Sequence, residues 1–101
     1  MRILARPILR EFGTKHRTSI IPLYYWWTKL TKANCNNFSE LKDLFGTVDY
    51  IGNDRYVFDI GGNNFRIVVI IKFKKQKVFI RRVLTHAEYD VHNRSGTLVT
   101  L

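Results

Sequence analysis

The chain has 101 residues, which is enough for one packed domain over residues 1–101 and too few for a second independent core. Hydrophobic residues make up 46% of the sequence and aromatic residues 14%, a composition that excludes an intrinsically disordered chain. The formal net charge of +9 predicts a polyanionic partner, because so positive a surface repels itself when nothing neutralises it.

The positive charge is concentrated in parts of the chain. Residues 1–33 carry seven basic side chains and a single carboxylate, whereas residues 34–59 are net acidic. No carboxylate occurs between residues 60 and 87, and seven basic residues lie there: Arg66, Lys72, Lys74, Lys75, Lys77, Arg81 and Arg82. This segment predicts an anion-binding surface, and we expect five of its members to attract nucleic-acid phosphates: Lys72, Lys74, Lys75, Lys77 and Arg82.

Cys35 is the only cysteine, so neither an intramolecular disulfide nor a thiolate metal cluster is expected. No stretch approaches the roughly 18 consecutive apolar residues of a membrane-spanning helix, and the N-terminal residues lack the apolar run of a signal peptide. These features predict a cytoplasmic protein with no membrane partner, no metal and no other cofactor.

The first half of the chain predicts a short strand followed by helices. Arg2–Ala5 is the candidate strand, and a helix begins at Pro7, which suits the first helical turn, and ends at Gly13. A further short helix is predicted over Ser39–Phe45, closed by Gly46.

Between these two helices lies a longer helix rich in aromatic residues. Its apolar positions at helical spacing are Ile20, Leu23, Tyr24, Trp27 and Leu30. This spacing predicts that Tyr24 and Trp27 pack in the core. Tyr25 and Trp26 fall off the predicted stripe and are therefore candidates for contact with a partner protein.

The second half of the chain predicts strands: Val48–Ile51, Arg55–Ile60, Asn64–Lys74 and Lys77–Leu84. Gly61–Asn63 and Lys75–Gln76 lie where hairpin turns are needed. The predicted fold class is therefore α+β, with two N-terminal helices packed on a small antiparallel sheet. Strict alternation along the last strand places Arg81 and Arg82 on opposite faces, and it does not decide which of them shares the face of Arg66.

The residues that follow the last strand can carry chemistry. If Thr85 caps a helical turn, His86 and Tyr89 lie close together. Cleavage of RNA without a metal needs a base for the ribose 2′-OH, cations for the phosphorane and an acid for the leaving oxygen. His86 can be the acid or the base, Tyr89 can position a nucleotide or share in proton transfer, and two guanidinium groups can bind a phosphate. The predicted catalytic residues are Arg66, Arg81, His86 and Tyr89.

Each of these features also has a purely structural explanation. Arg66, in an otherwise apolar strand, is explained equally by an ion pair with Asp59 or Glu88. A histidine near a strand end, such as His86, is often an ordinary surface residue. Lysines at a hairpin keep a sheet edge soluble without binding anything.

Four motifs in the C-terminal half carry a resemblance to a known family: Arg55–Asn63, Phe65–Val68, Gln76–Arg81 and Thr85–Asp90. In this order and spacing they resemble the HigB family of toxins, within the RelE-like group of mRNA interferases. The N-terminal half is similar only in layout. The residues that match the family's functional positions are Arg66, Arg81, His86 and Tyr89.

The resemblance implies a RelE-like toxin fold and cleavage of mRNA in the ribosomal decoding site, by attack of the 2′-OH on the phosphodiester. It implies as partners mRNA, ribosomal RNA and a HigA-like helix-turn-helix antitoxin. RelE uses lysines ahead of the first catalytic arginine, where this chain has Asp59 and Asn63, so we expect more of the proton transfer to depend on His86. The tail Val91–Leu101 does not resemble a family ending and receives no predicted order or role.

A non-catalytic alternative remains open at this point. The same fold is used by gyrase-inhibiting toxins, and a basic sheet can simply bind RNA or DNA. Such proteins need no histidine–tyrosine pair, so the motif Thr85–Asp90 favours the nuclease.

Overall fold

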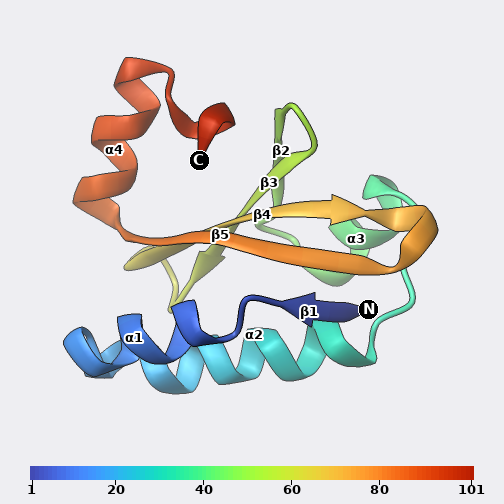
Figure 1. The fold of residues 1–101 in the computed structure, drawn as a ribbon, viewed down its shortest axis with the longest axis horizontal. Coiled ribbons are helices and arrows are strands. Elements are labelled where there is room, and N and C mark those ends of the chain that lie inside the picture. The colour runs from blue at the N-terminus through green and yellow to red at the C-terminus, as the bar shows by residue number, and fades with distance from the viewer.

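The computed structural model describes all 101 residues and arranges helices on both sides of a five-stranded sheet (Figure 1). In chain order the strands and helices are β1 (Arg2–Leu4), α1 (Pro7–Lys15), α2 (Ile20–Lys32), α3 (Phe38–Leu44), β2 (Asp49–Gly52), β3 (Arg55–Ile60), β4 (Phe65–Lys72), β5 (Lys77–Thr85) and α4 (His86–Ser95). None of the helices combines the length and apolar content needed to cross a lipid bilayer.

The sheet is mixed, which corrects one part of the predicted fold class. Its strand order is β1-β5-β4-β3-β2, and the four strands from β2 to β5 form the predicted antiparallel meander. β1 pairs with β5 in parallel, with Ile3 opposite Val78. A parallel neighbour needs a long crossover connection, and here the helices and the meander between β1 and β5 supply it.

The main core lies between the sheet and the helices α1 and α2, which run along one face (Figure 1). The prediction for α2 is confirmed for Leu23 and Leu30, which are buried, and for Trp27, which packs against the core. It is wrong for Tyr24, which is 61% exposed, and for Trp26, which was predicted to lie off the stripe and is 3% exposed. The indole of Trp26 packs edge-on against Phe58 of β3, with ring centroids 5.5 Å apart. Four consecutive aromatic residues provide an apolar stripe on either side of the helix, so the sheet decides which stripe is buried.

Helix α1 does not end at Gly13, as predicted, but continues to Lys15. Gly13 is buried, and a Cβ built on it would lie 3.0 Å from Cγ1 of Ile20 at the start of α2. The glycine therefore lies within the helix, close to the side chain of Ile20, and does not terminate it.

A second, smaller core lies on the opposite face of the sheet, which we call the open face. It consists of Val57, Val68, Leu84, Leu98 and Leu101. The last two belong to the tail for which no order was predicted. Gly96 ends α4 with a φ of 72°, and a short helical turn at Leu98–Thr100 then brings the chain back over the sheet. In Figure 1 the C-terminus accordingly lies between α4 and the β2–β3 hairpin.

Because Leu98 is buried on the open face, the C-terminal turn contributes to stability. We predict that Leu98→Ala lowers the free energy of unfolding by about 2–5 kcal/mol, the usual range for a leucine truncated in a core. Val91, which is exposed on α4, is the matched control. Val91→Ala should change the free energy of unfolding by less than about 0.5 kcal/mol. Denaturant unfolding followed by circular dichroism measures both; equal values would show that the turn does not pack on the sheet.

Candidate functional site

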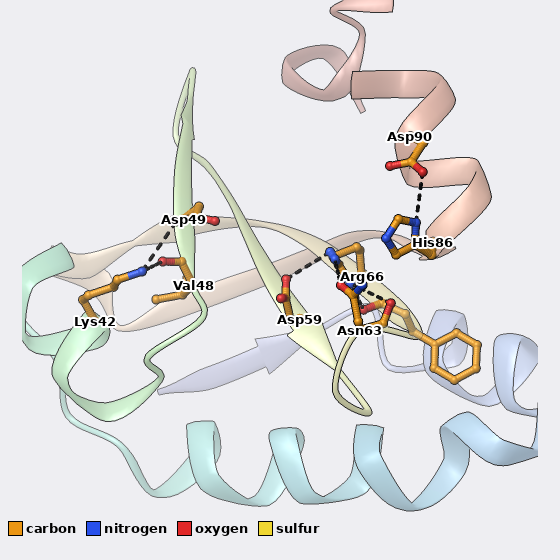
Figure 2. A network of polar contacts seen from close by, with 9 residues as sticks. Lys42, Val48, Asp49, Asp59, Asn63, Arg66, His86 and Asp90 are labelled. Atoms are coloured by element: carbon orange, nitrogen blue, oxygen red, sulfur yellow. Dashed lines mark hydrogen bonds and ion pairs between the residues drawn. The ribbon is translucent and has the colours of Figure 1, made fainter. Parts of the chain in front are cut away.

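The guanidinium group of Arg66 is buried at the end of the sheet where β4 begins. Arg66 is 7% exposed, and its Nε lies 3.0 Å from Oδ1 of Asp59 on the neighbouring strand β3. Nη1 donates to the main-chain oxygens of Asn63 and Phe65, and Nη2 donates to the side-chain oxygen of Asn63 (Figure 2). The guanidinium of Arg66 therefore makes three hydrogen bonds in addition to its ion pair with Asp59.

Tyr89 covers this guanidinium group. The centre of the Arg66 guanidinium lies 5.1 Å from the centroid of the Tyr89 ring, which is the geometry of a cation–π contact. Burial raises the pKa of the Tyr89 phenol above its ordinary value, and the nearby Arg66 offsets part of that shift. The phenol is therefore protonated at neutral pH, and it can donate a proton but cannot serve as a base.

The N-terminus of α4 brings His86 to the same end of the sheet. Thr85 Oγ1 accepts from the Glu88 amide while a Glu88 side-chain oxygen accepts from the Thr85 amide, so the helix starts with a capping box. The His86 amide donates to the main-chain oxygen of Asn64 at 3.1 Å, which ties α4 to the β3–β4 turn. In Figure 2 the His86 ring and Arg66 lie at the same end of the sheet.

These contacts also identify the counterion of Arg66. Of the two candidates from the sequence, Glu88 is used by the helix cap and Asp59 makes the ion pair. The His86 ring has its own carboxylate: Nδ1 lies 3.0 Å from Oδ2 of Asp90, one helical turn further along α4. Sequence reasoning missed Asp90, although a spacing of four residues on a helix was the available signal.

A β-bulge decides the orientation of the arginines on β5. Val68 pairs with Arg82 and Val69 pairs with Ile80, so Arg81 is an extra residue in the strand. Arg82 therefore lies on the face of Val68, and Arg81 reaches the same face, where its Nε donates to the main-chain oxygen of Leu101 at 3.0 Å. The expectation that the two point to opposite faces is wrong, because strict alternation does not hold across a bulge.

The lysines predicted to bind phosphate lie at the far end of the same hairpin. Arg66 and Lys72 are six residues apart on β4, which is about 20 Å of extended strand. Lys72 makes an exposed ion pair with Asp54 at 2.6 Å, and the others cluster around the β4–β5 turn: Lys74, Lys75 and Lys77. Of the predicted RNA-binding residues, only Arg82 lies beside the bulge.

The structure thus brings Arg66, His86 and Tyr89 to one end of the open face, with Arg81 further along the same face. No group of three or more histidine, cysteine or carboxylate side chains is arranged so that it could hold a metal ion.

A family model described as the HigB toxin, a RelE-like toxic component of a toxin–antitoxin system, matches residues 20–92. The chain belongs to the HigB toxin family.

Individual relatives agree with this family assignment. The mRNA interferase toxin HigB of Escherichia coli strain K12 is 32% identical over 106 aligned positions, which cover 95% of this chain and 98% of that protein. The mRNA interferase HigB of Shigella flexneri has the same identity and coverage. A HigB from Escherichia coli O6:H1 is 27% identical and covers 89% of each chain.

The ion pair between Arg66 and Asp59 should contribute more to the stability of this HigB-family chain than an exposed ion pair of similar length. We predict that Asp59→Asn lowers the free energy of unfolding by about 3 kcal/mol, because it leaves a buried guanidinium without its counterion. That is the low end of the usual range, since the Asp59 side chain is still 29% exposed.

The exposed Lys72–Asp54 pair provides the control. Asp54→Asn removes one carboxylate from a pair of 2.6 Å and should cost less than about 1 kcal/mol. Both variants are compared by denaturant unfolding at the same salt concentration. If Asp59→Asn and Asp54→Asn lowered the free energy of unfolding equally, burial of Arg66 would make no specific contribution to the strength of its ion pair.

Proposed function

We propose that this chain is an mRNA interferase: a cytoplasmic, ribosome-dependent, metal-independent endoribonuclease and the toxin of a toxin–antitoxin pair. The relatives named as mRNA interferases support this proposal. The observation that carries it is the placement of His86, held by Asp90, at the same end of the sheet as the guanidinium of Arg66, which Tyr89 covers. An acid–base group, a phenol and a cation are the components that metal-free cleavage of RNA requires.

The proposed reaction starts at the ribose 2′-OH. With a proton on Nδ1, His86 donates to Asp90, so the unprotonated Nε2 is the atom that removes the 2′-OH proton. The 2′-oxygen then bonds to phosphorus, and the bond from phosphorus to the 5′-oxygen breaks. A cyclic phosphate remains on the upstream fragment, and the leaving 5′-oxygen takes up a proton.

Tyr89 and the two arginines act on the other parts of this step. Because the Tyr89 phenol is protonated, it can give a proton to the leaving oxygen or stack on a base. Arg66 supplies a fixed positive charge next to Tyr89. Arg81 is exposed and neither of its Nη groups has a hydrogen-bond partner, so it has free donors for a phosphate.

The partners follow from the two sides of the molecule. The lysines at the β4–β5 turn would attract ribosomal RNA, and the open face would receive mRNA. On the opposite side, α2 exposes four large apolar residues: Ile20, Ile21, Tyr24 and Tyr25. Isoleucine side chains have no charge and no hydrogen-bond donor that could bind a phosphate backbone. We therefore assign this surface to a HigA-like antitoxin. Tyr25 remains a candidate contact, whereas the buried Trp26 does not.

The proposal predicts the effect of two substitutions at the site. His86→Gln and Tyr89→Phe should each reduce mRNA cleavage by about a hundredfold or more and relieve growth arrest, because each removes a proton-transfer group. His16→Gln is the control, since His16 stacks on Phe12 on the other side of the sheet. Primer extension on cellular mRNA after induction measures cleavage, and circular dichroism verifies folding.

Wild-type levels of cleavage by the folded His86→Gln and Tyr89→Phe variants would contradict the assignment of these residues to the active site. Growth arrest without any cleavage by the wild-type chain would instead favour a non-catalytic toxin.

Ribosome and metal dependence are tested separately with purified protein. We expect cleavage of mRNA on translating ribosomes to continue in the presence of EDTA, with enough magnesium added back to keep the ribosomes assembled. EDTA still binds transition metals under these conditions. Naked RNA in the same buffer should remain intact. Cutting of naked RNA would contradict ribosome dependence, and selective loss of activity after removal of a transition metal would contradict metal independence.

A further inference from the structure

Helices α1 and α2 form a groove on the helical side of the molecule. The groove has a volume of about 510 Å³, and its apolar lining consists of Leu9 from α1 and four residues of α2: Ile20, Leu23, Tyr24 and Trp27. A second hollow of about 630 Å³ adjoins it along α2, and Ile20 and Tyr24 line both hollows. Because these two side chains are 51% and 61% exposed, the two hollows form one apolar surface, which we call the α1–α2 surface. A continuous apolar surface of this kind marks a place where a partner binds.

The lining of the α1–α2 surface is also positively charged. Five of its residues are basic and none is acidic: Arg6, Arg10, Arg17, Lys29 and Lys32. None of the five forms an ion pair with a carboxylate of the chain. Arg6 and Lys29 instead lie over aromatic rings, 4.5 Å from the centroid of Trp27 and 4.8 Å from that of Phe45. Cations beside an apolar surface favour a partner that brings carboxylates, because water is excluded when the two surfaces meet.

Shape and charge together select the kind of partner. A phosphate backbone could pair with the cations, but it would leave the apolar lining uncovered. A lipid surface is flat, so it would touch Ile20 and Tyr24 between the hollows without filling a concave groove. A helix can fill the groove with apolar side chains at positions i, i+3, i+4 and i+7, and carboxylates beside that stripe can reach the cations. Its axis would lie about 8–10 Å from those of α1 and α2, the ordinary spacing of packed helices.

We propose that the α1–α2 surface binds an amphipathic helix of a partner protein, with carboxylates on both edges of its apolar stripe. The binding surface rests on the groove and its five basic residues. Only the assignment of this helix to the antitoxin rests on the proposed function. Because α1 and α2 lie on the opposite face of the sheet from Tyr89, the helix can bind without contacting the open face (Figure 1).

The test is binding of a labelled synthetic helix of about five turns to the full chain. One peptide has leucines along one side and glutamates on both edges of that side, and a matched peptide has lysines in place of the glutamates. The wild-type chain should bind the glutamate peptide about tenfold or more tightly than the lysine peptide, because only the glutamates complement the basic lining. Fluorescence anisotropy at physiological salt measures both affinities.

Substitutions of the basic lining test whether the attraction is specific to the groove. Arg10→Glu should weaken binding of the glutamate peptide by about tenfold or more and strengthen binding of the lysine peptide, because it reverses one charge of the lining. Arg94→Glu makes the same change in net charge on α4, where Arg94 is exposed. It should alter either affinity by less than about twofold, since salt screens charges that lie more than about 8 Å apart.

A second pair of variants tests the apolar contact. Tyr24→Ala should weaken binding of the glutamate peptide by about tenfold, because a large aromatic side chain is lost from the middle of the surface. Tyr50→Ala truncates a tyrosine of β2 that is 52% exposed and should leave the affinity close to that of wild type. Circular dichroism verifies that all four variants are folded.

A measurement on the wild-type chain does not depend on any variant. Addition of the glutamate peptide should shift the nitrogen-15 amide resonances of α1 and α2 and leave those of α4 unchanged. Equal effects of Arg10→Glu and Arg94→Glu, or shifts spread over the whole chain, would overturn the helix-binding site. Tighter binding to phosphatidylglycerol–phosphatidylcholine vesicles than to the peptide would overturn it in favour of a membrane.

Failure of this inference and failure of the proposed function give different results. Peptide binding needs no RNA, so a chain that binds the peptide through Arg10 but cuts no mRNA would refute only the proposed function. A co-expressed antitoxin should copurify with the wild-type chain and not with a variant that carries both Arg10→Glu and Tyr24→Ala. Its retention by that variant would refute the assignment of the helix to the antitoxin.

Discussion

The rest of the candidate site depends on one buried ion pair, between Arg66 and Asp59. A guanidinium that is 7% exposed has to be neutralised and hydrogen-bonded, because an unpaired charge in that position costs several kcal/mol. Asp59 neutralises it, and Asn63 fixes the β3–β4 turn around it. Tyr89 packs on its outer side, and the bond from the His86 amide to the main-chain oxygen of Asn64 holds the start of α4, and so His86, at the same end of the sheet.

The sheet separates two kinds of surface. One face packs on α1 and α2 and forms most of the core, while the outer side of α2 exposes apolar side chains that suit a protein partner. The other face holds only a small apolar cluster, partly made by the C-terminal turn, with arginines around it. A partner protein bound on α2 would not have to cover the face proposed to bind RNA.

The bulge at Arg81 is a small local feature with a large effect on charge. Without it, alternation would turn either Arg81 or Arg82 towards α1 and α2, where a buried cation would have no partner. With it, Ile80 and Val83 both face the main core and both arginines face the open side. One extra residue in the strand thus adds a second positive charge to the proposed RNA surface.

The sequence by itself determined the order of the elements as far as the start of α4, the antiparallel meander and the cap at Thr85, because turn residues, caps and strand alternation act over a few neighbouring residues. Its motifs also indicated the family. Only the tertiary structure decided which aromatic stripe of α2 is buried, since Tyr24 to Trp27 suit either side of a helix. It also decided that Asp59 pairs with Arg66, that β1 lies parallel to β5, and that Leu98 and Leu101 close the open face. These features arise from contacts between residues far apart in the chain, and no local pattern encodes them.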